Sequence, residues 1–593
     1  MVDDARLVRL AVEPPRDAAL VLRRATAYRP VVLLLCVLPP LWFAAWATLD
    51  TESASWALRA LAVQKAQRLE EWLEPGSQWP ECELRADPPL VSWLTASVMR
   101  SLPAGSTLAP VLISCLSLIG ATALLWQLCR EAIGERTALI LAIVFAFHPQ
   151  IAPLAATGAP TALTLFLLVA TAWGYWGHLE QDQGSVSIRL LAGGIAWGLA
   201  LLSGGWMALA LFVVLMLVSL ISRTTIAGET PSVGEMSSVR AVLLLGVTGA
   251  ALALWWPAMM FQAQGFSFLF DWLGLAPELR HYNSAHFRFE GWASWLGEPS
   301  LLIGWWCLGC WSAVRISLYE PSSRFRRWCR WLIVWNLVGL GGRILWRAMD
   351  GTPEALRNWD VFLCLPATLL AAQGLDRAMR RETSRLGLAA AIAVTAGAVG
   401  WLITHRASVA LVVAGAILVV LLASAPLAMG LRRARSTWSE GEIRAWVVIA
   451  AIATAIGHAA SAIIPLTKQE FDHVQWESLR RQMTQVESVA QTSIVASHQR
   501  DLVPWIYLVR SLWPAAKFSQ STGWDPRITA TLVAEARDPQ SRIVLLDWSR
   551  SGLRFRADVG SGWQVDPIVE PMAFRGHRLA VYLIRPLEVP APL

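Results

Sequence analysis

The chain has 593 residues, of which 55% are hydrophobic and 16% are charged, and its mean hydropathy is +0.46. Such a composition is typical of polytopic membrane proteins and excludes an ordinary soluble multidomain protein. The formal net charge of +7 does not indicate nucleic-acid binding, because the basic residues are dispersed between apolar runs, as the positive-inside rule requires.

The first apolar run covers residues 31–49 and is long enough to cross a hydrocarbon core about 30 Å thick. A segment of about thirty residues with prolines and many arginines precedes it, which is too long for the n-region of a signal peptide. We therefore expect an uncleaved anchor that follows a cytoplasmic N-terminal segment, residues 1–30. Two acids, Asp50 and Glu52, lie where this run ends.

Two segments of the following loop have a helical pattern. In residues 57–73, apolar side chains recur on one side at helical spacing and charged side chains fill the other, which predicts a helix lying on the membrane interface. A second segment, residues 87–94, has Pro88 and Pro89 at its start, where a missing N–H does no harm to a helix. We expect a second interfacial helix there.

The apolar runs predict about thirteen transmembrane helices in all. They cover residues 31–49, 108–128, 137–153, 159–177, 189–203, 205–222, 240–260, 298–316, 328–346, 358–375, 386–404, 408–428 and 444–464. Arginines gather in alternate loops, so those loops are predicted to be cytoplasmic, and the Asp50 loop and the C-terminus to be exterior. The count depends on residues 189–222, where Gly204 and Gly205 either join two short spans or kink one long span.

Beyond residue 465 the composition changes to that of a soluble domain. Residues 493–496, 542–548 and 579–584 predict short strands and residues 503–512 an amphipathic helix. We therefore expect a small α/β domain, residues 466–593, on the exterior side. The eight cysteines of the chain show neither a pairing pattern nor a metal-ligand pattern, so no disulfide and no cysteine-based metal site is predicted.

The succession of these features resembles a known family. An acidic motif after the first span, an interfacial helix, the segment Pro88-Pro89-Leu90-Val91-Ser92-Trp93-Leu94 and a long row of spans follow one another from about Pro30 to Asp376. This order is similar to that of the polyprenol-phosphate-sugar-dependent membrane glycosyltransferases of the GT-C type, which are related to protein O-mannosyltransferases and the lipid A aminoarabinose transferase. The resemblance implies a GT-C-like transmembrane domain, residues 31–465, in the plasma (inner) membrane.

The resemblance also implies an activity. It is the inverting transfer of a sugar from a polyprenyl-phosphate-linked donor to a lipid, glycan or protein acceptor of the cell envelope, on the exterior face. The implied partners are the donor, an acceptor that the sequence does not identify, and the lipid bilayer. No cofactor is implied, and a divalent metal ion is left open. Such a transfer needs a carboxylate to accept the proton of the acceptor and cations to stabilise the departing phosphate.

Asp50 matches the first acidic residue of the family and, with its neighbour Glu52, is the predicted catalytic group. A second aspartate, present in many relatives, is missing here, because the corresponding residues 156–160 are Ala-Thr-Gly-Ala-Pro. Either other acids of the first loop, such as Glu83 and Asp87, complete the site, or the chain is a catalytically inactive relative that binds polyprenyl lipid or scaffolds envelope assembly. A transporter or flippase is a further alternative, but the mid-membrane acids or broken helices that it needs are not evident.

Cations for the leaving phosphate are expected near the exterior ends of the spans. Arg343 and Arg347 lie at i and i+4 on one face of the predicted ninth span, and Arg357 precedes the tenth. Guanidinium groups bind phosphate oxygens bidentately, whereas the alternative is that these side chains snorkel to lipid headgroups. A second candidate set lies in the loop of residues 262–296 and consists of His281, His286 and Arg288.

Overall fold

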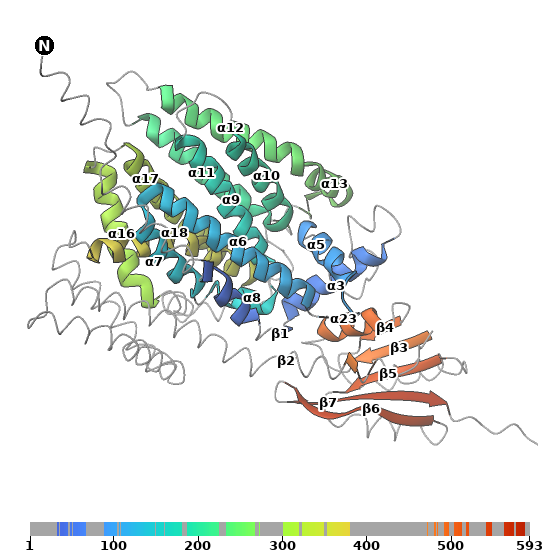
Figure 1. Cartoon of the computed structure of the whole chain (residues 1–593). Coiled ribbons are helices and arrows are strands. Elements are labelled where there is room, and N and C mark those ends of the chain that lie inside the picture. Colours follow the sequence, from blue (N-terminus) through green and yellow to red (C-terminus); the bar gives the residue numbers. More distant parts are fainter. Residues whose placement is uncertain are drawn as a thin grey trace, which may run out of the picture.

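The computed structural model describes part of the chain, drawn in colour in Figure 1. The described residues are 33–34, 36–44, 48–49, 51–66, 88–103, 106, 108–148, 150–158, 160–180, 187–224, 233–266, 268, 272, 300–319, 323–348, 353–379, 471–472, 480–481, 483, 491–496, 503–512, 517–520, 541–547, 563–574 and 577–586. The predicted spans at 386–404, 408–428 and 444–464 lie outside these residues. The count of about thirteen spans therefore stays a prediction.

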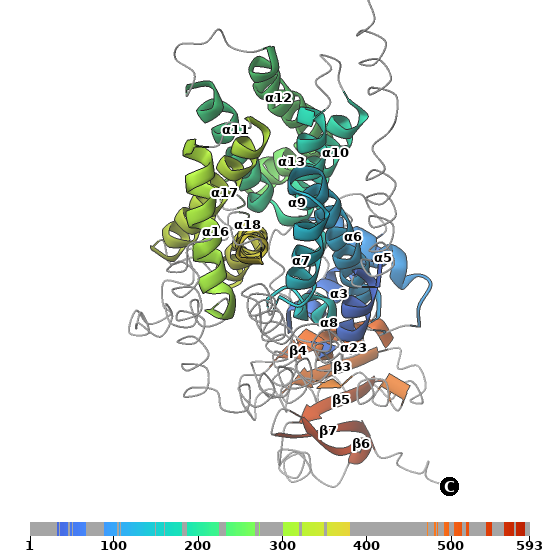
Figure 2. The same cartoon turned by 60° about the vertical axis from the view of Figure 1, so that its left-hand side comes forward.

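A bundle of helices forms the larger part of the described structure (Figures 1 and 2). Its elements are α6 (Leu108–Ile133), α7 (Glu135–Ala146), α8 (Pro153–Thr157), α9 (Thr161–Glu180), α10 (Ile188–Gly204), α11 (Trp206–Thr224), α12 (Val233–Ala253), α13 (Trp255–Gln264), α16 (Ser300–Tyr319), α17 (Ser323–Ala348) and α18 (Pro353–Met379). Each predicted span between residues 108 and 375 overlaps one of these helices, because long apolar runs form helices whose backbone groups pair internally.

Three details of the bundle differ from the sequence pattern or decide between alternatives. The run at 137–153 is divided, since α7 ends at Ala146 and the short helix α8 begins at Pro153. The run at 240–260 bends by 53° between α12 and α13. The question at 189–222 is answered in favour of two helices, because α10 ends at Gly204 and Gly205 has a positive φ of 46°.

Some of the helices meet a strict test of length and apolarity for crossing a membrane. Among the described residues, α6 and Thr161–Leu179 of α9 pass this test singly, and the bent pair Ser238–Ala253 and Trp255–Gln264 passes it together. The segments Ile188–Gly204 and Trp206–Ile221 are apolar but shorter.

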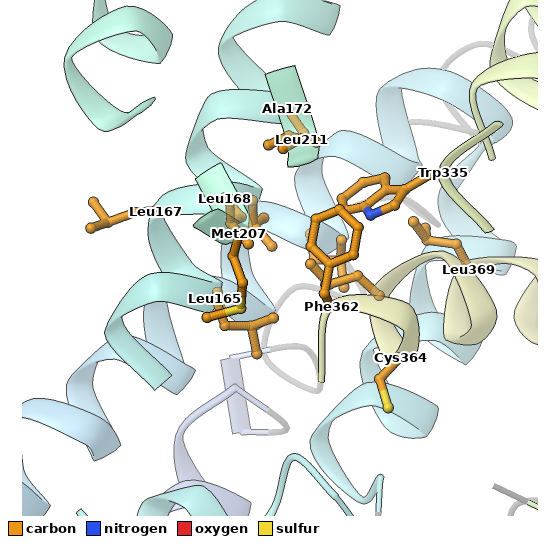
Figure 3. Packing of buried hydrophobic residues seen from close by; sticks show 14 of the residues in the cluster. Leu165, Leu167, Leu168, Ala172, Met207, Leu211, Trp335, Phe362, Cys364 and Leu369 are labelled. Carbon is orange, nitrogen blue, oxygen red and sulfur yellow. The ribbon is translucent and has the colours of Figure 1, made fainter. Parts of the chain in front are cut away.

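Small residues bring the helix backbones close together. A Cβ atom added to Gly174 of α9 would lie 2.6 Å from the Cα atom of Gly193 in α10, and one added to Gly309 of α16 would lie 2.0 Å from the carbonyl oxygen of Leu370 in α18. Close backbone approach of this kind is how helices associate in lipid, where apolar side chains alone give little driving force. Around these contacts large side chains fill the core, and Figure 3 shows Met207 and Leu168 across from Trp335 and Phe362.

The first loop contributes strand β1 (Thr48–Leu49) and helices α3 (Thr51–Lys65) and α5 (Leu90–Met99). Helix α5 begins directly after Pro89, as its sequence predicts. Helix α3 begins earlier than the predicted segment 57–73, and its residues 56–63 are buried on every side, Arg59 included. Lys65 is exposed, and residues 67–73 of the predicted segment lie outside the described residues, so the interfacial helix stays a prediction.

The C-terminal part contains a five-stranded sheet among its described residues. Its elements are β3 (Gln491–Ala496), α23 (Val503–Leu512), β4 (Lys517–Gln520), β5 (Ser541–Asp547), β6 (Trp563–Phe574) and β7 (His577–Pro586). The strand order is β4-β3-β5-β7-β6, with β3 parallel to β4 and β5, and β7 antiparallel to β5 and β6. The strands at 493–496, 542–548 and 579–584 coincide with β3, β5 and β7, and α23 is the helix between the parallel strands β3 and β4.

Figures 1 and 2 both place this sheet below the end of the bundle that carries α8, α3 and β1. Strand β1 pairs antiparallel with strand β2 (Phe471–Asp472), with Thr48 opposite Asp472 and Leu49 opposite Phe471. Helix α23 packs against α3. Segments more than 400 residues apart in the chain therefore meet at one end of the molecule.

Candidate functional site

Asp50 lies at the junction of β1 and α3. Its own placement is outside the described residues, but Leu49 ends β1 and Thr51 begins α3, so its two neighbours in the chain are described. Glu52 follows in the first turn of α3. The junction is held from both sides, because β2 pairs with β1 and both α5 and α23 pack against α3.

The segment between α7 and α9 connects this junction to α18. Helix α8 packs against β1 and against α9. The thiol of Cys364 in α18 donates a hydrogen bond to Oε1 of Gln150, and Oγ1 of Thr161 donates to Oδ1 of Asn358 at 2.9 Å. The first half of α18 is therefore tied by polar contacts to the segment that touches β1.

Residues 156–160, where relatives often have a second aspartate, close helix α8. Thr157 is its last residue, and Gly158 is in the left-handed conformation with a φ of 66°. A Cβ atom at this glycine would lie 3.0 Å from Cβ of Pro110, so the turn passes close to the start of α6. The described residues of this stretch carry no carboxylate, in agreement with the sequence.

Arg343 is buried and forms an ion pair within the bundle. Helices α17 and α18 pack against each other as a hairpin, and Nε of Arg343 in α17 donates a hydrogen bond to Oδ1 of Asp360 in α18. Only 9% of Arg343 is exposed, so its guanidinium group does not simply extend into water. Sequence reasoning missed Asp360, although an acid within an apolar run, beside a helix with a charge of opposite sign, was a signal for it.

The other two predicted arginines lie on the same hairpin. Arg347 is one turn beyond Arg343 on α17, and Arg357 is three residues before Asp360 on α18. Residues at i, i+3 and i+4 share a face of a helix. The backbone thus brings Arg343, Arg347 and Arg357 to one end of the hairpin, together with the acids Glu354 and Asp360 of α18.

Three tryptophans lie beside the ion pair. Trp206 of α11 stacks on Trp359, with ring centroids 4.2 Å apart, and on Trp346, with centroids 5.8 Å apart. Gly342, the residue before Arg343, leaves the space that Trp359 fills, because a Cβ atom there would lie 2.1 Å from its ring. Such an aromatic cluster excludes water from its surroundings, and charge interactions are stronger where water is excluded.

The remaining predicted site residues cannot be placed. Glu83, Asp87, His281, His286 and Arg288 all lie outside the described residues. Within the described part of the chain, no three His, Cys, Asp or Glu side chains are grouped as metal ligands would be.

Comparison with solved structures shows which fold this is. The chain matches ArnT from Cupriavidus metallidurans bound to undecaprenyl phosphate with a TM-score of 0.61 and 14% identity, over 96% of this chain and 99% of that one. The apo form of that protein gives a TM-score of 0.57 at 15% identity, over 96% and 98%. The archaeal oligosaccharyltransferase AglB from Archaeoglobus fulgidus, in complex with an inhibitory peptide and a dolichol-phosphate, gives 0.50 at 12%, over 87% and 69%.

The chain is therefore a multi-pass membrane protein with the GT-C fold. Residues 86–248 match the family model described as dolichyl-phosphate-mannose-protein mannosyltransferase. The resemblance that the order of motifs predicted is thus confirmed. No curated protein matches the chain in sequence.

Proposed function

We propose that this protein is a membrane glycosyltransferase that moves a sugar from a polyprenyl-phosphate-linked donor to an acceptor of the cell envelope. One observation carries the proposal: the fold matches over 96% of the chain a structure that holds undecaprenyl phosphate, which is itself a polyprenyl phosphate. The family model matched by residues 86–248 describes enzymes of the same donor class.

In the proposed reaction, Asp50 is the general base. It accepts the proton of an acceptor hydroxyl or amine while that group attacks the anomeric carbon of the sugar from the face opposite the phosphate. A new bond forms at that carbon, the bond to the phosphate oxygen breaks with inversion, and polyprenyl phosphate leaves with the electron pair. Glu52, Glu83 and Asp87 are the acids available to assist in place of the missing second aspartate.

The leaving phosphate requires positive charge, which we assign to Arg343, Arg347 and Arg357. The α17–α18 hairpin supports this assignment, since its end carries three arginines, beside the acids Glu354 and Asp360 of α18. Asp360 holds the Arg343 guanidinium in orientation through Nε, and a planar guanidinium is the side chain best suited to bind phosphate oxygens. His281, His286 and Arg288 are the second candidates.

We further propose an exterior location for the reaction, with residues 1–30 cytoplasmic, residues 31–465 in the inner membrane and residues 466–593 as an exterior α/β domain. The contacts of β1 with β2 and of α3 with α23 support it, because they require the first loop and the C-terminal part to lie on the same side of the membrane. An even number of spans must then separate them, which is compatible with thirteen in all. At the opposite end of the bundle, Nε of Arg136 lies 3.4 Å from Oδ1 of Asp376.

The test is a transfer assay on the full chain in detergent. Purified protein is incubated with a labelled polyprenyl-phosphate-sugar pool and an envelope acceptor fraction, beside Asp50→Asn as the control. We expect label in the acceptor with the wild-type protein and a large loss with the variant.

A second candidate function is favoured by the absence of an acid in residues 156–160: a catalytically inactive relative that binds the polyprenyl lipid. Wild-type protein that retains polyprenyl phosphate on gel filtration but transfers no label from any pool would support this candidate and refute the first.

A further inference from the structure

The C-terminal part of the chain contacts the first loop at three places, two of them directly beside Asp50 and one at the other end of the loop. The first is the pairing of β2 with β1, which fixes the two residues just before Asp50: Thr48 opposite Asp472 and Leu49 opposite Phe471. Backbone pairing of this kind sets both the position and the direction of a chain. The N-terminal side of the acid is therefore held by residues more than 400 positions away.

The second place is helix α3, which begins one residue after Asp50. A helix of 15 residues is marginal by itself in water and depends on packing against other elements. Helix α23 lies against α3 (Figures 1 and 2) and supplies such packing. Its residues Tyr507 and Leu508 are fully buried. Residues 56–63 of α3 are buried as well.

The third place is the other end of the first loop, between α5 and α6. The hydroxyl of Tyr507 donates a hydrogen bond to the carbonyl oxygen of Ser106 at 2.7 Å. Ser106 is itself fixed, because its N–H donates to Pro103 at 3.1 Å and its Oγ accepts from the N–H of Leu108 at 3.3 Å. Burial raises the pKa of Tyr507, so its hydroxyl keeps its proton and remains a donor at neutral pH.

We propose that β2 and α23 hold the segment that carries Asp50 in its working position, and that Tyr507 is a positioning residue for the transfer reaction. Tyr507 joins α23, which packs against α3, to Ser106, which lies just before α6. The proposal rests on the proposed function of Asp50. It gives the C-terminal part a role in the reaction without placing any of its side chains against the substrate.

The expected effect follows from geometry. Removing the hydroxyl of Tyr507 leaves the carbonyl of Ser106 without its donor and loosens α23 on α3, which lets the start of α3 shift. Displacements of about 1 Å at a catalytic group can lower turnover by on the order of 10²-fold. For the loss of this single hydrogen bond we expect kcat to fall about tenfold, and the KM for the donor to stay the same, because the arginines of the α17–α18 hairpin are untouched.

The test compares Tyr507→Phe with a matched control, Tyr175→Phe. Tyr175 is also a buried tyrosine whose hydroxyl is hydrogen-bonded, in this case at 2.9 Å to Ser219 between α9 and α11, inside the bundle. Two measurements are made on each full-length variant in detergent. The first is the kinetics of transfer, which gives kcat and KM, and the second is hydrogen–deuterium exchange of the peptides covering residues 51–65. Exchange reports the stability of α3 whether or not the protein transfers sugar.

We expect Tyr507→Phe to raise exchange in residues 51–65 and to lower kcat, and Tyr175→Phe to do neither. A cross-link between β1 and β2 should then restore both the exchange in residues 51–65 and the kcat of Tyr507→Phe. Cysteines introduced at Thr48 and Asp472, which are antiparallel cross-strand partners, have a Cα separation of about 4.5–5.5 Å, within the range that a disulfide spans. Mass spectrometry confirms the bond, and reduction reverses the rescue.

Unchanged exchange in Tyr507→Phe, or raised exchange with unchanged kcat, would overturn the positioning role. Equal loss of kcat in Tyr507→Phe and Tyr175→Phe would also overturn it, because the effect would then be general destabilisation. Failure of the proposed function is seen separately: it is shown by a wild-type protein without transfer or by full activity in Asp50→Asn, whereas the exchange comparison still decides whether Tyr507 orders α3.

Discussion

Asp50 occupies a position with two separate physical uses. It is the residue before helix α3, where an aspartate side chain can cap the free N–H groups of the first turn, and it is the first acid after the predicted membrane exit. The two uses require different chemistry, since a cap needs only an oxygen acceptor, whereas a general base needs a carboxylate. A substitution that keeps the acceptor and removes the base therefore separates them.

Asp50→Asn is that substitution, because asparagine caps helices about as well as aspartate. We expect transfer to fall by on the order of 10²-fold or more, with little change in the melting temperature. The measurement is the initial rate of label transfer in detergent, beside a thermal melt. Asp50→Ala, which removes cap and base together, should lose stability as well as activity. Wild-type turnover in Asp50→Asn would move the base to Glu52 or Glu83.

The Arg343–Asp360 ion pair gives Arg343 a structural role that is independent of any phosphate. A side chain that is 9% exposed cannot lose its partner cheaply, because hydrogen bonds to charged groups contribute about 1.5–3 kcal/mol each. A role in donor binding would add to this one. Substitutions that change the charge of Arg343, its planar geometry or its ion-pair partner one at a time distinguish the two roles.

Arg343→Lys keeps the charge and loses the planar fork. If Arg343 also binds the donor phosphate, we expect this variant and Arg347→Lys to weaken donor affinity by about 1–3 kcal/mol with little loss of stability. Donor affinity is measured by binding of labelled lipid in detergent. The control is the pair Arg343→Gln and Asp360→Asn, whose separate costs in stability should exceed the cost of the double variant. Unchanged affinity in both lysine variants would restrict Arg343 to the ion pair.

At the scale of elements, the break between α10 and α11 depends on one residue. Gly205 has a φ of 46° and a ψ of −103°, a conformation that side-chain-bearing residues rarely adopt, and the indole of Trp197 in α10 donates a 2.8 Å hydrogen bond to the carbonyl of Ala208 in α11. The two helices are thus folded against each other. This break also places Trp206 so that it stacks on Trp359, beside Arg343.

Gly205→Ala should therefore destabilise the protein. Backbone strain of this kind costs about 1–3 kcal/mol, and the new Cβ atom would also lie 2.5 Å from Nε1 of Trp272. The measurement is the melting temperature in detergent. Gly341→Ala on α17 is the matched control, because nothing lies within 4 Å of its added Cβ atom and alanine favours a helix by up to about 1 kcal/mol. Equal melting temperatures in the two variants would show that the break tolerates a side chain.

At the scale of the whole molecule, the arginine pattern and the tertiary contacts are two independent arguments about the side of the membrane on which the C-terminal part lies. Arginines in alternate loops predict which loops are cytoplasmic. The pairing of β1 with β2 requires the first loop and the C-terminal part to share a side, whatever the number of spans between them. The two arguments agree on an exterior C-terminus.

Reporter fusions test this topology directly. We expect a fusion after Arg435 to give a cytoplasmic signal and a fusion after Pro590 to give an exterior signal, with the N-terminus and the loop at 320–330 cytoplasmic. Expression of both fusions is checked on a blot with antibody against the reporter. Cytoplasmic signals from both positions would mean that the number of spans is even and that the predicted parity is wrong.

The sequence by itself determined the helical bundle, because the bilayer selects for long apolar runs and for helices whose backbone groups pair internally. It also located the strands β3, β5 and β7 and the start of α5, where local propensity and proline chemistry decide. The choice of Asp50, Arg343 and Arg347 as site residues also came from their positions relative to the predicted spans, and it stays a prediction. These features depend on neighbours within a few residues, so a local pattern contains them.

Only the tertiary structure decided which residues from distant parts of the chain contact one another. The partner of Arg343 is Asp360 on another helix, Arg59 of α3 is buried, and Tyr507 reaches a carbonyl 401 residues away. The division of 137–153 into two helices and the 53° bend after α12 likewise follow from packing. In each case the free energy of a side chain or backbone group depends on atoms contributed by distant parts of the chain, and no local pattern records which of those parts it will meet.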